Sequence, residues 1–285
     1  MNPKIKKLTI LPGKNKSGAP EVFDKIEINT GEIIAIVGPT GCGKSQLLYD
    51  IEKLACGTTK SKRKILINDQ TAEKEWRFDP KQKLIASLAQ SMNFLTDLSV
   101  KEFLELHIHA RGKSANQNLV EETIKKTNAI TGEPITPEMN LLNLSGGQTR
   151  ALMVADAAHI STSPIILIDE IENAGIKKEK ALEILIQEGK IVFLVTHDPS
   201  LALNANKRLV IQNGGIISVL QTTEKEKEIA NYLNWLEGYN LDMRDEIRQG
   251  KQIEELKIVC KPKEETLRND FSQKLKIPQG ERNKK

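Results

Sequence analysis

Residues 38–45, with the sequence GPTGCGKS, combine the residue types that bind phosphate groups. They match the pattern G-x-x-x-x-G-K-S/T and lie between an apolar run typical of a strand and a segment with helical spacing. Glycines let the backbone curl so that successive N–H groups converge on phosphate oxygens. We expect Lys44 to reach the β- and γ-phosphates of a nucleoside triphosphate and the Ser45 hydroxyl to bind Mg²⁺. The predicted nucleotide contacts are Gly38, Pro39, Thr40, Gly41, Cys42, Gly43, Lys44, Ser45 and Gln46.

A second glycine-containing motif, LSGGQ at residues 144–148, offers another anion site. Ser145, Gly146 and Gly147 are expected to open a helix, where a hydroxyl and free N–H groups face an anion. About two dozen residues later, IILIDE at residues 165–170 places four apolar residues before two carboxylates. This pattern predicts a buried strand whose carboxyl end presents Asp169 and Glu170 at the ligand edge of a sheet.

Taken with Gln90 and His197, each of which follows a predicted strand, these motifs resemble the nucleotide-binding domain of ATP-binding-cassette (ABC) ATPases. The resemblance covers about residues 5–220 and keeps the family order of phosphate loop, glutamine, signature, carboxylate pair and histidine. It implies ATP and Mg²⁺ as cofactors, with Ser45, Gln90 and Asp169 as metal ligands. It also implies Glu170 as general base, with His197, Lys44 and Gln90 as further catalytic residues.

The resemblance further implies a partner. Residues Ser145, Gly146, Gly147 and Gln148 would bind the γ-phosphate of an ATP molecule held by a second ABC domain. Two copies of the chain would then enclose two ATP molecules head to tail, as a homodimer.

The positions of these motifs require a particular architecture. Strands are predicted at Lys7–Leu11, 22–28, Ile33–Val37, Lys64–Ile67, 84–89, 165–168 and Ile191–Val195, with a hairpin over 210–220. Helices are predicted at 46–54, Val100–Ala110, 119–129, 151–159 and Lys178–Gln187. Alternating strands and helices favour an α/β fold. The family implies a P-loop NTPase of ABC type: a mainly parallel core sheet, an antiparallel β subdomain and a helical subdomain.

The predicted ABC domain spans residues 1–221, with the helical subdomain at about 91–150. From residue 222 to 285 charged residues of both signs dominate, around apolar residues that keep some helical spacing. We interpret this part as a charged, mainly helical extension with a frayed tail. It is either a solvated appendage or a segment that docks a partner or stabilises the dimer.

Composition narrows the class of protein. The 285 residues include 39% hydrophobic and only 4% aromatic residues, and the net charge is +4. Basic and acidic residues are interspersed, so no nucleic-acid partner is expected. The three cysteines are an odd number and form no C-x-x-C pair, which fits a reducing compartment. The longest apolar runs reach strand length only, and the first residues lack a signal-peptide core. These features predict a cytoplasmic protein, peripheral to the inner face of a membrane if a partner holds it there.

Three histidines outside the motifs are not expected to bind metal. His107 and His109 point apart on one helix, and His159 has no evident partner in the sequence.

Four departures from the family pattern stand out. No aromatic residue in the region 15–19 replaces the one that stacks on adenine, and Phe23 is expected to be a core strand residue. Gln46 follows Ser45 where threonine is common. Arg150 comes one position early after the signature, and Asp156 stands where arginine is common. Ile176 replaces the aspartate of a loop that crosses the dimer interface. We expect altered communication between the two ATP sites, testable by Ile176→Asp.

The sequence supports three hypotheses for what ATP hydrolysis drives. The chain is the energy-coupling subunit of a membrane transporter, a soluble ATPase that remodels a protein or cofactor-assembly complex, or a switch that dimerises on ATP with little turnover. The intact Glu170 and His197 count against the third.

Overall fold

The computed structural model describes residues 5–73, 75–76, 83–89, 92–112, 117–171 and 175–252. Internal contacts divide the chain into two units, Met1–Trp235 and Leu236–Lys285. Gln90, Cys260 and residues 172–174 lie outside the described residues.

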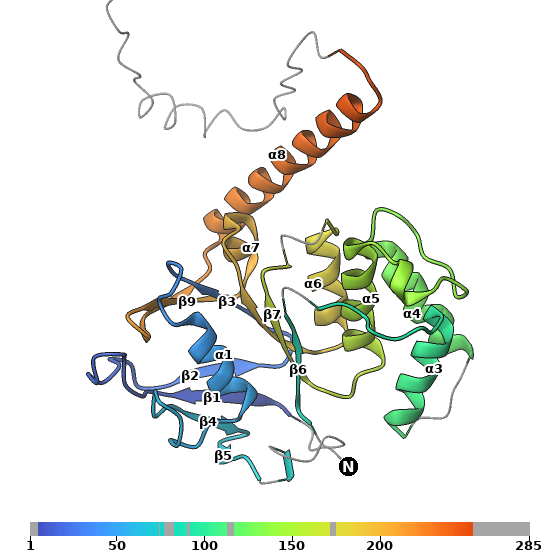
Figure 1. The fold of residues 1–285 in the computed structure, drawn as a ribbon. Helices are drawn as coiled ribbons and strands as arrows, with labels where there is room; N and C mark the ends of the chain where they lie inside the picture. Colours follow the sequence, from blue (N-terminus) through green and yellow to red (C-terminus); the bar gives the residue numbers. More distant parts are fainter. Residues whose placement is uncertain are drawn as a thin grey trace, which may run out of the picture. The chain divides into compact units, whose positions relative to one another are not determined.

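The first unit contains two sheets (Figure 1). The strands are β1 (Lys7–Leu11), β2 (Ile26–Asn29), β3 (Ile33–Val37), β4 (Lys64–Ile67), β5 (Gln70–Thr71), β6 (Ile85–Leu88), β7 (Ile165–Asp169), β8 (Ile191–Val195), β9 (Lys207–Gln212) and β10 (Gly215–Gln221). The helices are α1 (Lys44–Glu52), α3 (Val100–Ala110), α4 (Gln117–Ile130), the 3-10 turn η2 (Leu141–Asn143), α5 (Gly146–His159), α6 (Lys178–Gln187), α7 (Pro199–Asn204) and α8 (Glu224–Arg248), which runs past residue 235.

The larger sheet has six strands in the order β10-β9-β3-β8-β7-β6. Strands β9, β3, β8, β7 and β6 run parallel, and β10 pairs antiparallel with β9. Asn213 and Gly214 connect β9 to β10 with φ angles of 47° and 78°, the left-handed conformation that a tight hairpin turn requires. The predicted mainly parallel core and the predicted hairpin are therefore confirmed.

The smaller sheet is antiparallel, in the order β2-β1-β4-β5. Its second strand begins at Ile26, so the prediction of a strand from residue 22 was wrong at its start. Val22 is 95% exposed, and Phe23 packs against the core from outside the strand. The preceding backbone closes a loop instead, because Glu21 N–H donates to the Gly13 carbonyl and the Glu21 side chain pairs with buried Arg63.

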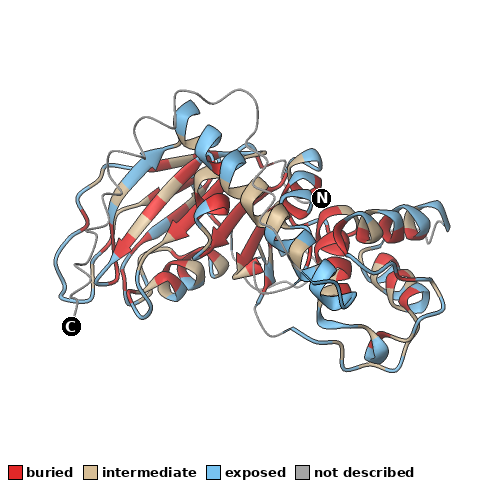
Figure 2. Cartoon of the chain, turned by 90° about the horizontal axis from the view of Figure 1, so that it is seen from above, coloured by how far each residue is buried: buried red, intermediate tan, exposed pale blue. Residues whose placement is uncertain are grey.

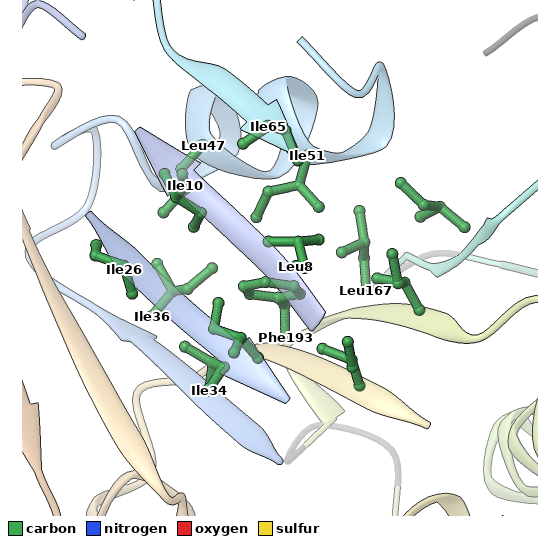
Figure 3. Close-up of a cluster of buried hydrophobic side chains, with 14 of the residues drawn as sticks. Leu8, Ile10, Ile26, Ile34, Ile36, Leu47, Ile51, Ile65, Leu167 and Phe193 are labelled. Carbon is green, nitrogen blue, oxygen red and sulfur yellow. The ribbon is translucent and has the colours of Figure 1, made fainter. Parts of the chain in front are cut away.

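One hydrophobic core lies between the two sheets and includes α1 (Figure 3). The cluster includes Leu47 and Ile51 of α1 and Leu8 of β1, together with Ile36 of β3 and Phe193 of β8. Alternate residues of β3 point to this core and to the opposite face, as the two-residue period of a strand requires. Helix α1, which begins at Lys44, is therefore held against this core by its apolar face.

The opposite face of the six-stranded sheet is covered by α5, α6 and α7, whose apolar residues form a second core. A third cluster joins α3 and α4 to Leu152 of α5 and to Ile160, which follows that helix. Buried residues follow the strands and the inward faces of these helices, while the outer helix faces are exposed (Figure 2). No helix among the described residues is long and apolar enough to cross a membrane.

Most predicted elements lie within a few residues of their predicted bounds, apart from the start of β2. Helix α5 begins at Gly146, as expected from Ser145, Gly146 and Gly147 opening a helix, although apolar periodicity alone placed the helix start at 151. Its first residues, GGQTR, carry little apolar periodicity, and the helix starts there because the Ser145 side chain caps it. The signature motif thus forms the first turn of a long helix.

Candidate functional site

The motif residues meet where three neighbouring parallel strands end. In the register of the sheet, Ile36 of β3 lies opposite Val195 of β8, which lies opposite Asp169 of β7. The phosphate loop follows β3, Glu170 follows β7, and His197 comes two residues after β8. Parallel strands present their carboxyl ends at one edge, where ligands bind in sheets of this type. The fold therefore brings residues from three distant parts of the chain to one place.

The phosphate loop takes a shape that only glycine allows at two of its positions. Gly38 has a φ of 153°, and a Cβ atom there would lie 2.4 Å from the Ile211 carbonyl oxygen. Gly43 has a φ of 111°, and its Cβ would lie 2.7 Å from the Gly214 Cα. The loop consequently sits directly against the β9–β10 turn. Helix α1 begins at Lys44, so its free N–H groups face the same side as the loop.

Lys44 is largely buried and its ammonium group lies over the loop. Nζ donates to the carbonyl oxygens of Gly38 at 2.7 Å and Pro39 at 3.2 Å. It also lies 3.5 Å from Nε2 of His197. The same ring nitrogen is 3.8 Å from Oε1 of Glu170. Lys44, His197 and Glu170 thus form a continuous row.

Glu170 has a strained backbone. Its φ is 52°, a left-handed conformation that non-glycine residues seldom adopt and that clusters at functional sites. Its N–H donates to the Val195 carbonyl at 3.0 Å, and its own carbonyl accepts a hydrogen bond from Arg150 Nη1 at 3.1 Å. Arg150 Nη2 donates to the Ala89 carbonyl at 3.3 Å. The Arg150 guanidinium, on helix α5, therefore links the backbone of Glu170 to that of Ala89, the residue before Gln90.

This role of Arg150 was missed in the sequence, where the residue was only a departure from the usual spacing. We expect Arg150→Gln to lower kcat about tenfold with KM little changed, because the shorter amide cannot reach both carbonyl groups and Glu170 loses its fixed orientation. Steady-state kinetics would check this, with thermal unfolding to verify the fold. A rise in KM at constant kcat would contradict it.

Asp198 supports the backbone next to His197. Its carboxylate caps α7 by accepting from the Ser200 N–H at 2.8 Å, and it pairs with Lys178 Nζ at 2.5 Å. Partial burial raises the pKa of this carboxyl, but the hydrogen bonds from Lys178 and Ser200 outweigh burial and hold the pKa below its ordinary value.

A depressed pKa makes the contribution of Asp198 to stability present above about pH 4 and progressively lost as the pH falls through the folded-state pKa. We expect Asp198→Ala to lower the free energy of unfolding by about 1 to 2 kcal/mol at neutral pH. The gap between variant and wild type should narrow as the pH falls below about 4. Urea denaturation at several pH values measures it; a gap that stays constant with pH would refute the ionic contribution.

The signature residues form an N-cap. Ser145 Oγ accepts from the Gln148 N–H at 3.3 Å, and Gln148 Oε1 accepts from the Ser145 N–H at 2.9 Å. Gln148 is buried and also donates to the Glu133 carbonyl at 3.4 Å. Around Gly146 there is open space. These hydrogen bonds cap the first turn of α5 and connect it to Glu133.

Two of the three predicted metal ligands can be placed. Ser45 is an exposed hydroxyl at the start of α1, and Asp169 is a half-buried carboxylate at the end of β7. These hard oxygen donors, one neutral and one charged, suit Mg²⁺, which keeps few protein ligands and takes the rest from phosphate and water. The residues therefore fit the ion. The third predicted ligand, Gln90, lies outside the described residues.

Ile176 does not occupy the exposed interface position that its loop suggests. It is only 9% exposed, packs in the core shared with α5 and α6, and pairs through a β-bridge with Thr131. An aspartate there would bury a carboxylate, so Ile176→Asp is not a clean test of communication between ATP sites.

We expect Ile176→Asp to lower the free energy of unfolding by about 2 to 3 kcal/mol, against about 1 kcal/mol for Ile176→Val. Denaturant titration of the two variants gives the comparison, and equal small losses would show that position 176 is in contact with water.

Two histidines that the sequence left without partners are paired. His107 Nδ1 lies 2.6 Å from Asp156 Oδ1 and so connects α3 to α5, which explains why an aspartate stands at position 156. His159 lies 3.2 Å from Glu122 and 3.5 Å from Glu188, so the expectation of no partner was wrong. These pairs join helices that are far apart in the sequence, and neither pattern is visible in the sequence itself.

Comparison with known proteins identifies relatives of the chain. The family model described as ABC transporter matches residues 24–173, just over half of the chain. An uncharacterized ABC transporter ATP-binding protein of Methanocaldococcus jannaschii is 51% identical over 259 residues, which cover 90% of this chain and 99% of the relative.

The macrolide export ATP-binding/permease protein MacB of Mannheimia succiniciproducens is 31% identical over 72% of this chain, which spans only 32% of MacB. Among solved structures, the ADP conformation of an ATP-binding cassette of an ABC transporter shares the fold with a TM-score of 0.56. That likeness has 19% sequence identity and covers 79% of this chain and 94% of the other.

Proposed function

The chain belongs to the ABC transporter family, and from this premise we propose that it is the energy-coupling subunit of a membrane transporter. As a member of that family it binds and hydrolyses ATP.

The proposed catalytic step rests on the row formed by Lys44, His197 and Glu170. Glu170 would accept the proton of the attacking water, and its fixed backbone would hold the carboxylate at the required place. His197 lies between Lys44 and Glu170, where a ring nitrogen can hold the γ-phosphate and the water in line. Lys44 would stabilise the charge that develops on the phosphate oxygens.

Mg²⁺ belongs to the same proposal. The Ser45 hydroxyl and the Asp169 carboxylate are the described residues that would hold it, and Gln90 is the third proposed ligand. Held there, Mg²⁺ would supply positive charge that offsets part of the negative charge of the triphosphate.

Two copies of the chain are proposed to complete each site. Ser145, Gly146, Gly147 and Gln148 of one copy would contact the ATP held by Lys44 of the other. The capped start of α5 favours this, because the first N–H groups of the helix and the exposed Ser145 hydroxyl suit a phosphate group.

The proposed partner is an integral membrane protein, which would hold the chain at the cytoplasmic face of a membrane. The observation that carries the proposal is the 51% identity to a protein described as an ABC transporter ATP-binding protein, over nearly the whole length of both chains. The free energy of closing the dimer reaches a partner only if that partner binds the two states differently.

The test is a parallel pull-down. Tagged Glu170→Gln, loaded with ATP and Mg²⁺, is applied to detergent-solubilised membranes and to soluble extract, with Lys44→Ala as the nucleotide-free control. We expect Glu170→Gln to recover an integral membrane protein that Lys44→Ala does not. Recovery of a soluble enzyme or a cofactor-assembly protein instead would replace the transporter function with that of a remodelling ATPase.

A further inference from the structure

The loop of residues 13–20 lies close to the phosphate loop, although it belongs to none of the nucleotide-binding motifs. Its Lys16 N–H donates to the Asn213 carbonyl at 2.8 Å, and Asn213 Nδ2 donates to Ser17 Oγ at 2.8 Å. Gly214, the next residue of the turn, donates its N–H to the Cys42 carbonyl of the phosphate loop at 2.6 Å. A Cβ atom at Gly214 would lie 2.6 Å from Lys16 Cγ. The turn is thus packed between the two loops.

Three buried charged side chains hold these loops together. Glu21 Oε2 accepts from the Gly13 N–H at 2.8 Å, and Glu21 pairs with Arg63 at 2.6 Å. Arg63 also pairs with Asp50 of α1 at 2.9 Å and donates to the Gly214 carbonyl at 2.7 Å. All three charged side chains are at most 1% exposed. This network of buried charges therefore connects the 13–20 loop, the β9–β10 turn and helix α1 to one another.

Local hydrogen bonds shape the tip of the loop. Asn15 Oδ1 accepts from the N–H groups of both Ser17 and Ala19 at 3.0 Å. The Asn15 N–H donates to the Ala19 carbonyl at 2.9 Å. The backbone that carries Lys16 is consequently held before any ligand arrives, and an ordered backbone lowers the cost of binding.

Lys16 extends from this loop onto the phosphate loop. Its Nζ donates to the Gly41 carbonyl at 2.6 Å, while the side chain stays exposed. Among the described residues its ammonium forms no salt bridge with a carboxylate. A second ammonium group, besides Lys44, thus stands at the loop where a triphosphate would bind. Its bond to a neutral carbonyl is readily exchanged for a stronger bond to a phosphate oxygen.

The same loop contains no group that could stack on a base. Residues 13–20 are GKNKSGAP, and the nearest aromatic residue in the sequence, Phe23, packs against the hydrophobic core. We propose that Lys16 binds the phosphate chain of the nucleotide, so that this site selects nucleotides by their triphosphate rather than by their base. This inference rests on the ATP-binding function stated above.

The experiment compares binding of three triphosphates, the β,γ-imido analogues of ATP, GTP and CTP with Mg²⁺, by isothermal titration calorimetry of the full chain. Lys16→Met keeps the aliphatic stem and removes the charge, and Lys16→Arg restores a charge. Lys14→Met is the matched control, because Lys14 is an exposed lysine of the same loop. Circular dichroism verifies that each variant is folded.

We expect Lys16→Met to weaken all three analogues by a similar factor of about ten, with Lys16→Arg and Lys14→Met within about threefold of wild type. The loss should shrink in about 1 M salt, because Lys16 is exposed and its charge is screened. The proposal is overturned if Lys16→Met binds as Lys14→Met does, or if it weakens only the adenine analogue, which would mean a contact with the base. Failure of wild type to bind any analogue would instead refute the ATP-binding function.

Discussion

Glu170→Gln is expected to lower the rate of ATP hydrolysis by about 1,000-fold while leaving ATP binding intact, because a neutral amide cannot take the proton of the attacking water. Glutamine keeps the size of the side chain, and the backbone contacts of Glu170 with Val195 and Arg150 involve its N–H and carbonyl groups only. Phosphate release and calorimetric ATP binding, measured on the same preparation, would separate the two effects.

The matched control for this variant is Glu183→Gln. Glu183 is an exposed carboxylate of α6 that pairs with Lys180, so removing its charge should leave hydrolysis unchanged. Hydrolysis by Glu170→Gln at the wild-type rate would exclude Glu170 as general base. Loss of ATP binding would give Glu170 a structural role.

Lys44→Ala is expected to weaken ATP binding by about 100-fold or more and to abolish hydrolysis. The ammonium group is held over the phosphate loop by the Gly38 and Pro39 carbonyl groups, so it is in place before the triphosphate arrives. Removing it leaves the charge of the triphosphate opposite two carbonyl oxygens with no cation between them. A loss of about 2.8 kcal/mol corresponds to this factor.

Lys53→Ala provides the control, because Lys53 ends the same helix and its side chain is half exposed. It should bind ATP as wild type does. Unfolding curves of both variants are needed, since Lys44 is buried. A Lys44→Ala protein that is folded and binds ATP normally would contradict the assignment of the phosphate loop.

Much of the fold could be predicted from the sequence because its signals are local. Strands β3 and β8 bury residues on both faces, so each is a short apolar run with clear ends. The hairpin follows from Asn213 and Gly214, and α3 from its apolar residues at helical spacing. The proximity of Lys44, Glu170 and His197 could be predicted because each comes shortly after one of three neighbouring parallel strands, β3, β7 and β8.

The remaining features depend on contacts between distant residues. The start of β2 depends on Glu21, which pairs with Arg63. The two residues are 42 positions apart, and the phosphate loop lies between them in the sequence. The contacts of Arg150 with Ala89 and Glu170, and of His107 with Asp156, likewise join separate elements. A single sequence shows that such residues are charged, but it does not show which of them meet.

Ile176 illustrates a different difficulty. The family pattern aligns it with an aspartate, while its burial shows that the side chain packs inward. The type of residue at position 176 does not show whether the side chain faces the solvent or the core. Its burial in the structure is needed to decide what the substitution means.

The central claim, that two copies of this chain share each ATP site, is tested most directly by light scattering on a size-exclusion column. The sample is Glu170→Gln with ATP and Mg²⁺. We expect a mass of about twice 31.8 kDa with ATP and of one chain with ADP. Adding Ser145→Arg to the same protein should return it to one chain. A monomer in ATP, or a dimer that Ser145→Arg does not disturb, would contradict the account.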